Sequence, residues 1–276
     1  MRVLLVQVTT GTDPASNRDT VVEAVSRAVA ASGGPGACDL VVLPDAVQAD
    51  FGAGDPPPAA AAEPLDGPFS QVLASLARDT GASVVAGMFE APAEPSANAD
   101  AQRGRPTNTL LAVDPSGATV AAYRKVHLYD AFGYRESDSL AGGPLRATTV
   151  EVAGWTVGLM TCYDLRFPEQ ARVLVDAGAD LLVVPAAWVR GPGKEHHWTT
   201  LLAARAIENT VYVAGVAKAG PRYCGLTRLV DPMGRVVAGL GEQDGAVAAV
   251  LDRQRVADVR AANPSLVNRR WRVVGR

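Results

Sequence analysis

Short strand-like runs alternate with helical patterns along this chain, and the alternation restricts the folds that it can adopt. Residues 39–43 and 181–184 form apolar runs of the kind found in strands that are buried on both faces. The segment 195–210 has helical periodicity and places Trp198 on an apolar face that should belong to the core. Because such strands need helices or a second sheet to cover them, the pattern predicts a layered α/β or α+β fold.

The same patterns predict other elements along the chain. We expect helices at 20–31, 69–78 and 168–177, and strands at 2–8, 83–89, 211–216, 225–230, 236–240 and 246–251. Turn sequences at 114–117, 153–154 and 231–234 predict three hairpins between neighbouring strands.

Two stretches rich in proline and alanine, 54–64 and 91–106, are expected to be long surface loops. They can also be interpreted as domain linkers, but the candidate catalytic residues described below lie on both sides of each stretch. We therefore predict one domain that spans residues 1–276. The sequence leaves open whether 54–64 closes over a pocket.

Composition argues against several classes of function. The formal charge is −3 and the basic residues are scattered, so no nucleic-acid partner is expected. No apolar run approaches the ~18 residues of a membrane span, so no membrane partner is expected either. Three cysteines, an odd number, without an export signal predict a cytoplasmic protein with free thiols. Three histidines and no zinc-binding motif argue against a metal site.

One segment carries a specific chemical signal. In GLMTCYDLRFPE (158–169), an apolar strand ends at Cys162 and a helix begins at Pro168. This order lifts a thiol onto a turn whose backbone N–H groups can meet an anion. Taken alone, Cys162 would more often be a small buried hydrophobic residue.

Two other segments supply groups that can work with a thiol. In YRKVHL (123–128), Lys125 stands at a strand end and can stabilise a thiolate or an oxyanion, although such basic clusters are usually solvated. In LVVLPD (40–45), a buried strand ends in Asp45, whose carboxylate can act as a general base when burial raises its pKa. The alternative for Asp45 is a turn or helix-cap residue.

Together the three segments resemble the nitrilase superfamily of carbon–nitrogen hydrolases, whose pattern is a Glu in L-P-E, a Lys in R-K-x-H and a Cys in C-Y-D-x-R-F-P-E. The resemblance covers almost the whole chain. It implies a four-layer α-β-β-α sandwich, homodimers or larger homo-oligomers, a Glu–Lys–Cys triad and no cofactor. It also implies Cys162 as the nucleophile, an oxyanion hole made by Lys125 and the Tyr163 backbone N–H, and Glu136 as a second glutamate near the site.

Asp45 departs from this pattern, because the family has glutamate at its position. Aspartate is one methylene shorter, so its carboxylate can lie ~1 Å or more too far from the thiol, and a displacement of that size can reduce the rate ~10²-fold. Three outcomes follow. The backbone shifts to compensate, Glu136 takes over proton transfer, or the chain is slow, specialised or inactive. An inactive chain would be a degenerate scaffold that binds a ligand or partner.

The segment around Cys162 is most similar to the ω-amidase and deaminated glutathione amidase branch, which acts on linear amides that carry a distal carboxylate. The expected substrate is therefore a small-molecule amide, cleaved through a Cys162 thioester with release of ammonia. Nitriles and N-carbamoyl amines are the alternative substrates.

Basic residues near the motif can bind a substrate carboxylate. Arg166, Arg190 and Lys194 are the candidates for that ion pair, and Trp188 is a further substrate-binding candidate. Arg166 can equally form an ion pair within its own segment, with Glu169 or Asp164.

Structural roles are expected for other residues. His127 should bond to the backbone, Arg205 and Glu208 should form an ion pair at i and i+3, and Cys38 and Cys224 should pack in the core.

Overall fold

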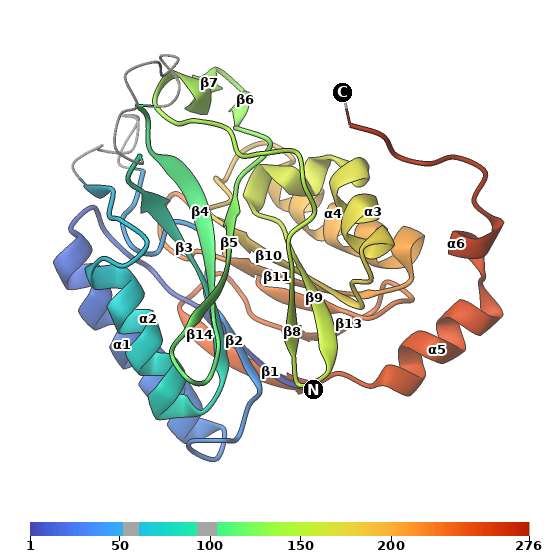
Figure 1. Cartoon of the computed structure of the whole chain (residues 1–276), viewed down its shortest axis with the longest axis horizontal. Helices are drawn as coiled ribbons and strands as arrows, with labels where there is room; N and C mark the ends of the chain where they lie inside the picture. The colour runs from blue at the N-terminus through green and yellow to red at the C-terminus, as the bar shows by residue number, and fades with distance from the viewer. Residues whose placement is uncertain (52–60, 93–103, 276) are drawn as a thin grey trace.

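Two six-stranded β-sheets lie face to face at the centre of the protein, and helices cover their outer faces (Figure 1). The computed structural model describes residues 1–51, 61–92 and 104–275. Most of the two expected loops, 54–64 and 91–106, lies outside the described residues. The expectation that 54–64 could close over a pocket concerns these residues and therefore stays open.

The first sheet has the strand order β14-β1-β2-β3-β4-β5. Its strands are β1 (Arg2–Gln7), β2 (Leu40–Val42), β3 (Ser83–Glu90), β4 (Thr107–Val113), β5 (Thr119–Arg124) and β14 (Gly245–Val250). The strands β1, β2 and β3 run parallel, while β14, β4 and β5 join antiparallel. Its outer face is covered by α1 (Pro14–Ala31) and α2 (Pro68–Thr80) (Figure 1).

The second sheet repeats this arrangement with the order β13-β12-β11-β10-β9-β8. Its strands are β8 (Thr149–Val152), β9 (Trp155–Leu159), β10 (Leu181–Ala186), β11 (Tyr212–Ala217), β12 (Arg228–Val230) and β13 (Val236–Gly239). The strands β9, β10 and β11 run parallel. Its outer face is covered by α3 (Pro168–Asp176) and α4 (Lys194–Asn209).

Short elements connect and extend the two sheets. They are the hairpin β6 (Asp130–Ala131) and β7 (Tyr134–Arg135), the 3₁₀ helices η2 (Glu136–Asp138) and η3 (Cys162–Arg166), and the C-terminal helices α5 (Arg253–Ala262) and α6 (Ser265–Asn268). Within the described ranges, no helix has the length and apolar character needed to cross a membrane.

Three apolar layers hold the sheets and helices together. Side chains such as Leu5 and Leu159 are fully buried between the sheets, and separate clusters fill the spaces under the two helix pairs. Helix α4 packs closely on β11 because Gly215 has no side chain: a Cβ there would lie 2.5 Å from Leu202 and 2.8 Å from Trp198. Trp198 is fully buried, as predicted. Removal of this apolar surface from water stabilises the stack of four layers.

The four-layer α-β-β-α sandwich confirms the expected fold, and the three expected hairpins are present as β4–β5, β8–β9 and β12–β13. Two elements begin three or more residues away from their predicted starts. Helix α1 begins six residues earlier than expected, because the Asp13 side chain caps the helix by accepting from two backbone N–H groups. Strand β12 begins three residues late, because Gly225 and Leu226 have φ of +58° and +59°, which a strand cannot adopt.

Candidate active site

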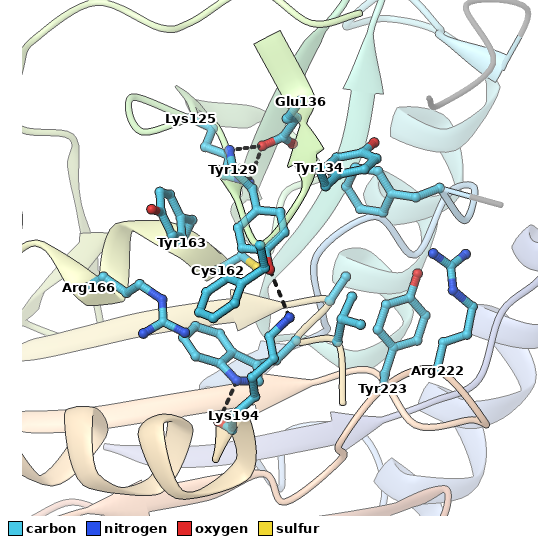
Figure 2. Close-up of a pocket in the computed structure, with 15 residues that line it drawn as sticks. Lys125, Tyr129, Tyr134, Glu136, Cys162, Tyr163, Arg166, Lys194, Arg222 and Tyr223 are labelled. Atoms are coloured by element: carbon cyan, nitrogen blue, oxygen red, sulfur yellow. Dashed lines mark hydrogen bonds and ion pairs between the residues drawn. The ribbon is translucent and has the colours of Figure 1, made fainter. Parts of the chain in front are cut away.

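A pocket of about 850 Å³, including the space at its mouth, lies beside the ends of several strands (Figure 2). Its walls include three of the predicted catalytic residues, Lys125, Glu136 and Cys162. Lys125 follows β5, Cys162 follows β9, and Glu136 begins η2. The site therefore joins segments of both sheets in one pocket.

Cys162 is the first residue of η3 and follows the turn after β9. Its φ of +48° is in the left-handed region, which a non-glycine residue adopts only under local constraint. The constraint comes from Asp164, whose carboxylate accepts the Thr161 N–H at 2.9 Å, and from the Thr161 hydroxyl, which donates to Pro185 O at 2.8 Å. The Tyr163 N–H lies in the first turn of η3, where the N–H groups of a helix have no partners within the helix.

The Cys162 thiol is partly exposed in the pocket. Burial in its surroundings raises its pKa to about 12, and the carboxylates of Asp45 and Glu136 act in the same direction against the opposing effect of Lys125. A thiol with such a pKa needs a base that removes its proton as it attacks.

Lys125 and Glu136 form a buried ion pair on the pocket wall. Lys125 Nζ lies 2.7 Å from Glu136 Oε2, and each side chain is only 1% exposed. The same Oε2 accepts the Tyr129 N–H at 2.6 Å, while Oε1 has no partner among the described residues. Burial alone would lower the pKa of Lys125, but Glu136, the nearby thiol and Asp45 together hold it above its usual value, so the ammonium is permanent.

Asp45 is not one of the residues that line the pocket. Its carboxylate is fully buried and has one hydrogen-bond partner among the described residues, Asn108, at 3.4 Å from Oδ2, while Oδ1 has none. Burial raises the pKa of Asp45 to about 6, against the attraction of Lys125. The structure thus places the sequence-predicted base close enough to interact electrostatically with Lys125 and Glu136.

The backbone at Asp45 is held tightly on both sides. A Cβ at Gly87 of β3 would lie 2.7 Å from Asp45 Cα, so only glycine allows this approach. Ala46 follows with φ of +50°, and its carbonyl accepts a hydrogen bond from Lys218 Nζ at 3.1 Å. These contacts fix the position of the turn that carries the aspartate.

Arg166 and Lys194, two of the residues predicted to bind a carboxylate, line the pocket. Trp188, a further predicted substrate-binding residue, lines it as well. Arg166 Cζ lies 4.8 Å from the centre of the Trp188 ring, and Lys194 Nζ donates to the Tyr129 hydroxyl at 2.8 Å. Neither cation has an ion-pair partner among the described residues, so the ion pair considered for Arg166 with Glu169 or Asp164 is absent there.

Arg190, the third candidate, lies outside this pocket. Its Nη2 lies 3.0 Å from Glu242 Oε2, an exposed ion pair between two loops. The structure therefore does not bring Arg190 together with Cys162, and its position does not suit the substrate-binding role expected for it.

Several pocket residues were missed by the sequence analysis. Tyr129, Phe132 and Tyr134 line the pocket and come from the segment between Lys125 and Glu136. The sequence signal that could have identified them is their position between two candidate catalytic residues. Arg222 and Tyr223 come from the loop between β11 and β12, which carries no recognisable motif.

Residues expected to be structural mostly have that role. Arg205 Nη1 lies 2.8 Å from Glu208 Oε1, and Cys38 and Cys224 are buried, as predicted. The prediction that His127 bonds to the backbone was wrong: its Nδ1 lies 2.8 Å from Asp164 Oδ1, because the buried carboxylate offers a stronger partner than a carbonyl.

Comparisons with known proteins give a consistent picture. Residues 2–261 match the family model described as carbon-nitrogen hydrolase. The chain is 49% identical over 168 residues to a deaminated glutathione amidase of Escherichia coli O157:H7, a match that spans 61% of this chain and 64% of that protein. It is 34% identical to the deaminated glutathione amidase of Bos taurus, over 97% of this chain and 81% of that protein.

A solved structure is similar over the whole chain. It is that of a CN-hydrolase superfamily protein from Xanthomonas campestris with an arsenic adduct in its active site. The two chains are 29% identical, the TM-score is 0.84, and the match covers 100% of this chain and 99% of the other.

Proposed function

The chain belongs to the carbon–nitrogen hydrolase family and is an amidase, and we propose that it cleaves a small linear amide through a thioester on Cys162. The observation that carries the proposal is the pocket in which Cys162 lies with the buried Lys125–Glu136 ion pair. A permanent ammonium beside a thiol can stabilise the negative charge that develops on the carbonyl oxygen during attack. The thiol beside this ion pair also favours an enzyme over a degenerate scaffold that only binds a ligand or partner.

Proton removal from the thiol is assigned to Asp45. A pKa of about 6 leaves its carboxylate ionised at neutral pH, yet close enough to that pH to hold a proton briefly. Glu136 is the second candidate, because it lines the pocket and its Oε1 has no partner among the described residues, whereas Asp45 does not line the pocket. In the first case Glu136 holds Lys125 in place through Oε2; in the second it also accepts the proton.

The reaction then proceeds in two halves. The Cys162 sulfur bonds to the carbonyl carbon while the carboxylate takes the thiol proton, and Lys125 and the Tyr163 N–H hold the oxyanion. The carboxylic acid returns the proton to the nitrogen, the C–N bond breaks and ammonia leaves. A water molecule, deprotonated by the same carboxylate, attacks the thioester and releases the acid and the thiol.

The substrate is proposed to carry a carboxylate at a distance from the amide. Arg166 and Lys194 line the pocket without carboxylate partners among the described residues, so each can pair with an anionic group of the substrate. Nitriles and N-carbamoyl amines stay the alternative substrates, because the same thiol and oxyanion hole suit their reactions.

Three further expectations remain proposals. The 276 residues form one catalytic domain, two or more copies associate, and the protein is cytoplasmic. Three unpaired cysteines suit the reducing conditions of a cytoplasm.

Ammonia release from a panel of amides, including half-amides of dicarboxylic acids, tests the function. Wild type, Cys162→Ala, Asp45→Asn, Asp45→Glu and Glu136→Gln are compared. We expect turnover of half-amides by wild type, none by Cys162→Ala, and a loss of ~10²–10⁴-fold in kcat/KM for the variant that lacks the base. Activity of Cys162→Ala equal to wild type would contradict the proposal. Higher activity of Asp45→Glu would show that the shorter side chain limits the natural rate.

A further inference from the structure

Lys218 is a buried ammonium that takes no part in the proposed reaction. It directly follows β11, its side chain is fully buried, and it does not line the pocket. Burial of a charge is unfavourable, and it lowers the pKa of Lys218 below the usual value. The partners that compensate this charge therefore indicate what the residue does.

The first partner of Lys218 is the turn that carries Asp45. Lys218 Nζ donates to the Ala46 carbonyl at 3.1 Å. Lys218 extends a strand of the second sheet, whereas Asp45 and Ala46 come after β2 of the first sheet, so this bond joins the two sheets. Ala46 has φ of +50°, which a residue with a side chain rarely adopts. A charged donor on its carbonyl stabilises the turn in this conformation.

The backbone of Lys218 is fixed on both sides. Its N–H donates to Ala186 O at 2.8 Å, and its carbonyl accepts the Gly225 N–H at 3.0 Å. Ala186 is the last residue of β10, so Lys218 is anchored to the middle of the second sheet. A side chain that extends from such a rigid position can hold the Asp45 turn in place.

Two carboxylates compensate the charge of Lys218. Asp50 Oδ2 lies 3.5 Å from Lys218 Nζ, and Oδ1 of the same carboxylate accepts a hydrogen bond from the Tyr223 hydroxyl. The second carboxylate is that of Asp45, because Asp45 and Lys218 each favour the charged form of the other. Arg222 acts on Lys218 in the opposite direction. The buried ammonium is therefore coupled to Asp45 through charge as well as through the Ala46 carbonyl.

Three charged side chains act on the Asp45 carboxylate. Lys125 and Lys218 favour its ionised form, as does the hydrogen bond from Asn108, and Glu136 opposes it. Lys125 is itself paired with Glu136 at 2.7 Å, so the effects of these two charges on Asp45 partly cancel. Loss of the Lys218 charge would therefore leave Asp45 with one cation whose field is already reduced by a carboxylate.

We propose that Lys218 is a positioning residue for the base of the reaction: it ties the Asp45 turn to the end of β11 and supplies a second positive charge for the Asp45 carboxylate. The inference rests on the proposed function, in which Asp45 removes the thiol proton. It assigns to Lys218 an effect on the rate and on the pH dependence of the reaction. Substrate binding should not depend on Lys218, because its side chain does not line the pocket.

Kinetics of Lys218→Met and Lys218→Arg test the inference, with succinamate, the half-amide of succinic acid, as the substrate. Lys218→Met removes the charge and the donor, and we expect it to lower kcat about tenfold or more while KM changes less than about threefold. Because the base must be ionised, the acid limb of kcat/KM reports its pKa, and loss of a positive charge should move that limb to higher pH by about one pH unit. Lys218→Arg keeps the charge and a donor and should retain most of the wild-type rate and pH profile.

A second measurement does not require catalysis. The stability advantage of Asp45→Asn is measured by urea unfolding as a function of pH, once in otherwise wild-type protein and once in Lys218→Met. The advantage should level off above about pH 6 in the first background, because burial raises the pKa of Asp45 to about 6. It should level off about one pH unit higher in the second background, where the Lys218 charge is absent. Lys218→Gln, which is uncharged but polar, gives the same comparison where Lys218→Met does not fold.

Arg205→Met is the matched control. Arg205 is also a buried cation, donates to Leu165 O at 3.1 Å, pairs with Glu208 at 2.8 Å and does not line the pocket. Its loss should lower the free energy of unfolding. It should move neither the acid limb of kcat/KM nor the pH at which the Asp45→Asn advantage levels off.

The outcomes separate this inference from the proposed function. If Lys218→Met lowers stability but moves neither the acid limb nor the levelling-off pH, Lys218 is only structural and the inference is overturned. A higher KM with unchanged kcat also overturns it, as does a moved levelling-off pH with an unmoved acid limb in an active enzyme. If wild type hydrolyses no amide of the panel while the levelling-off pH still moves, the amidase proposal fails and the coupling of Lys218 to Asp45 is supported.

Discussion

The Tyr123 hydroxyl donates a hydrogen bond to the Asp164 carboxylate at 2.6 Å, and this bond joins the two segments that carry the proposed nucleophile and its lysine. Tyr123 lies two residues before Lys125, and Asp164 lies two residues after Cys162. Asp164 also accepts the His127 N–H at 3.1 Å. Because one buried carboxylate receives bonds from both segments, the separation of thiol and ammonium depends on it.

Tyr123→Phe should loosen this connection while keeping the ring volume. Loss of a buried hydrogen bond to a charged group should lower the free energy of unfolding by about 1.5–3 kcal/mol. A small displacement of Lys125 relative to Cys162 should also reduce kcat/KM by about 10-fold or more. Urea unfolding and steady-state kinetics measure the two effects. Tyr212→Phe, outside the pocket, is the control; reduced stability with unchanged kcat/KM would limit Asp164 to a structural role.

Glu136→Gln should be among the most damaging conservative changes. It removes the main counter-charge of a fully buried ammonium, and breaking such a pair typically lowers stability by about 3–5 kcal/mol. Glu208→Gln breaks the Arg205 ion pair, in which the glutamate is 35% exposed, and should have a much smaller effect. The free energies of unfolding of the two variants are compared in urea. Equal free energies of unfolding for the two variants would mean that another group balances the charge of Lys125 when Glu136 is replaced by a neutral residue.

The fold and the centre of the site could be predicted because their signals are local. A continuous apolar strand that ends at Cys162 or Asp45 is visible as a run of letters, and the turns that join the hairpins have a fixed residue chemistry. The boundary of α1 was missed because its start depends on the capping bonds of Asp13, which periodicity does not describe.

The pocket wall could not be predicted, because its residues meet only through tertiary packing. Arg222 is remote in sequence from Tyr134 and belongs to a loop without a motif. Arg190 was expected to pair with a substrate carboxylate because it is basic, yet its side chain pairs with Glu242. Similarly, the close approach of β3 to the turn that carries Asp45 depends on Gly87, which no local pattern reveals.

Asp45→Asn should stabilise the protein at neutral pH. Burial raises the pKa of Asp45 from 3.8 to about 6, so the folded state resists its ionisation. A group whose pKa is raised by folding contributes stability that is fully present below its pKa in the unfolded chain. That stability is lost as the pH rises through its pKa in the folded protein. The stability advantage of Asp45→Asn over wild type should therefore grow between pH 4 and 6 and level off above, at about 3 kcal/mol.

Urea unfolding of both proteins at several pH values measures this difference. Asp66→Asn, which changes an aspartate in the exposed turn before α2, is a control that should not show the same pH dependence. An advantage that is constant from pH 4 to 8 would mean that Asp45 titrates alike in the folded and unfolded chain. In that case it would be a poor candidate for a base tuned by burial.

Alkylation of the thiols by iodoacetamide should depend on access more than on activation. Burial raises the pKa of all three cysteines, including Cys162 to about 12, but Cys162 lines the pocket whereas Cys38 and Cys224 are buried. Peptide mapping should therefore find Cys162 modified well before the others. Because the thiolate fraction rises about tenfold per pH unit below the pKa, its rate should climb steadily between pH 7 and 9. A plateau near pH 7 would instead mean that the thiolate is already formed at rest, and a carboxylate base would then be needed only for the later steps of the reaction.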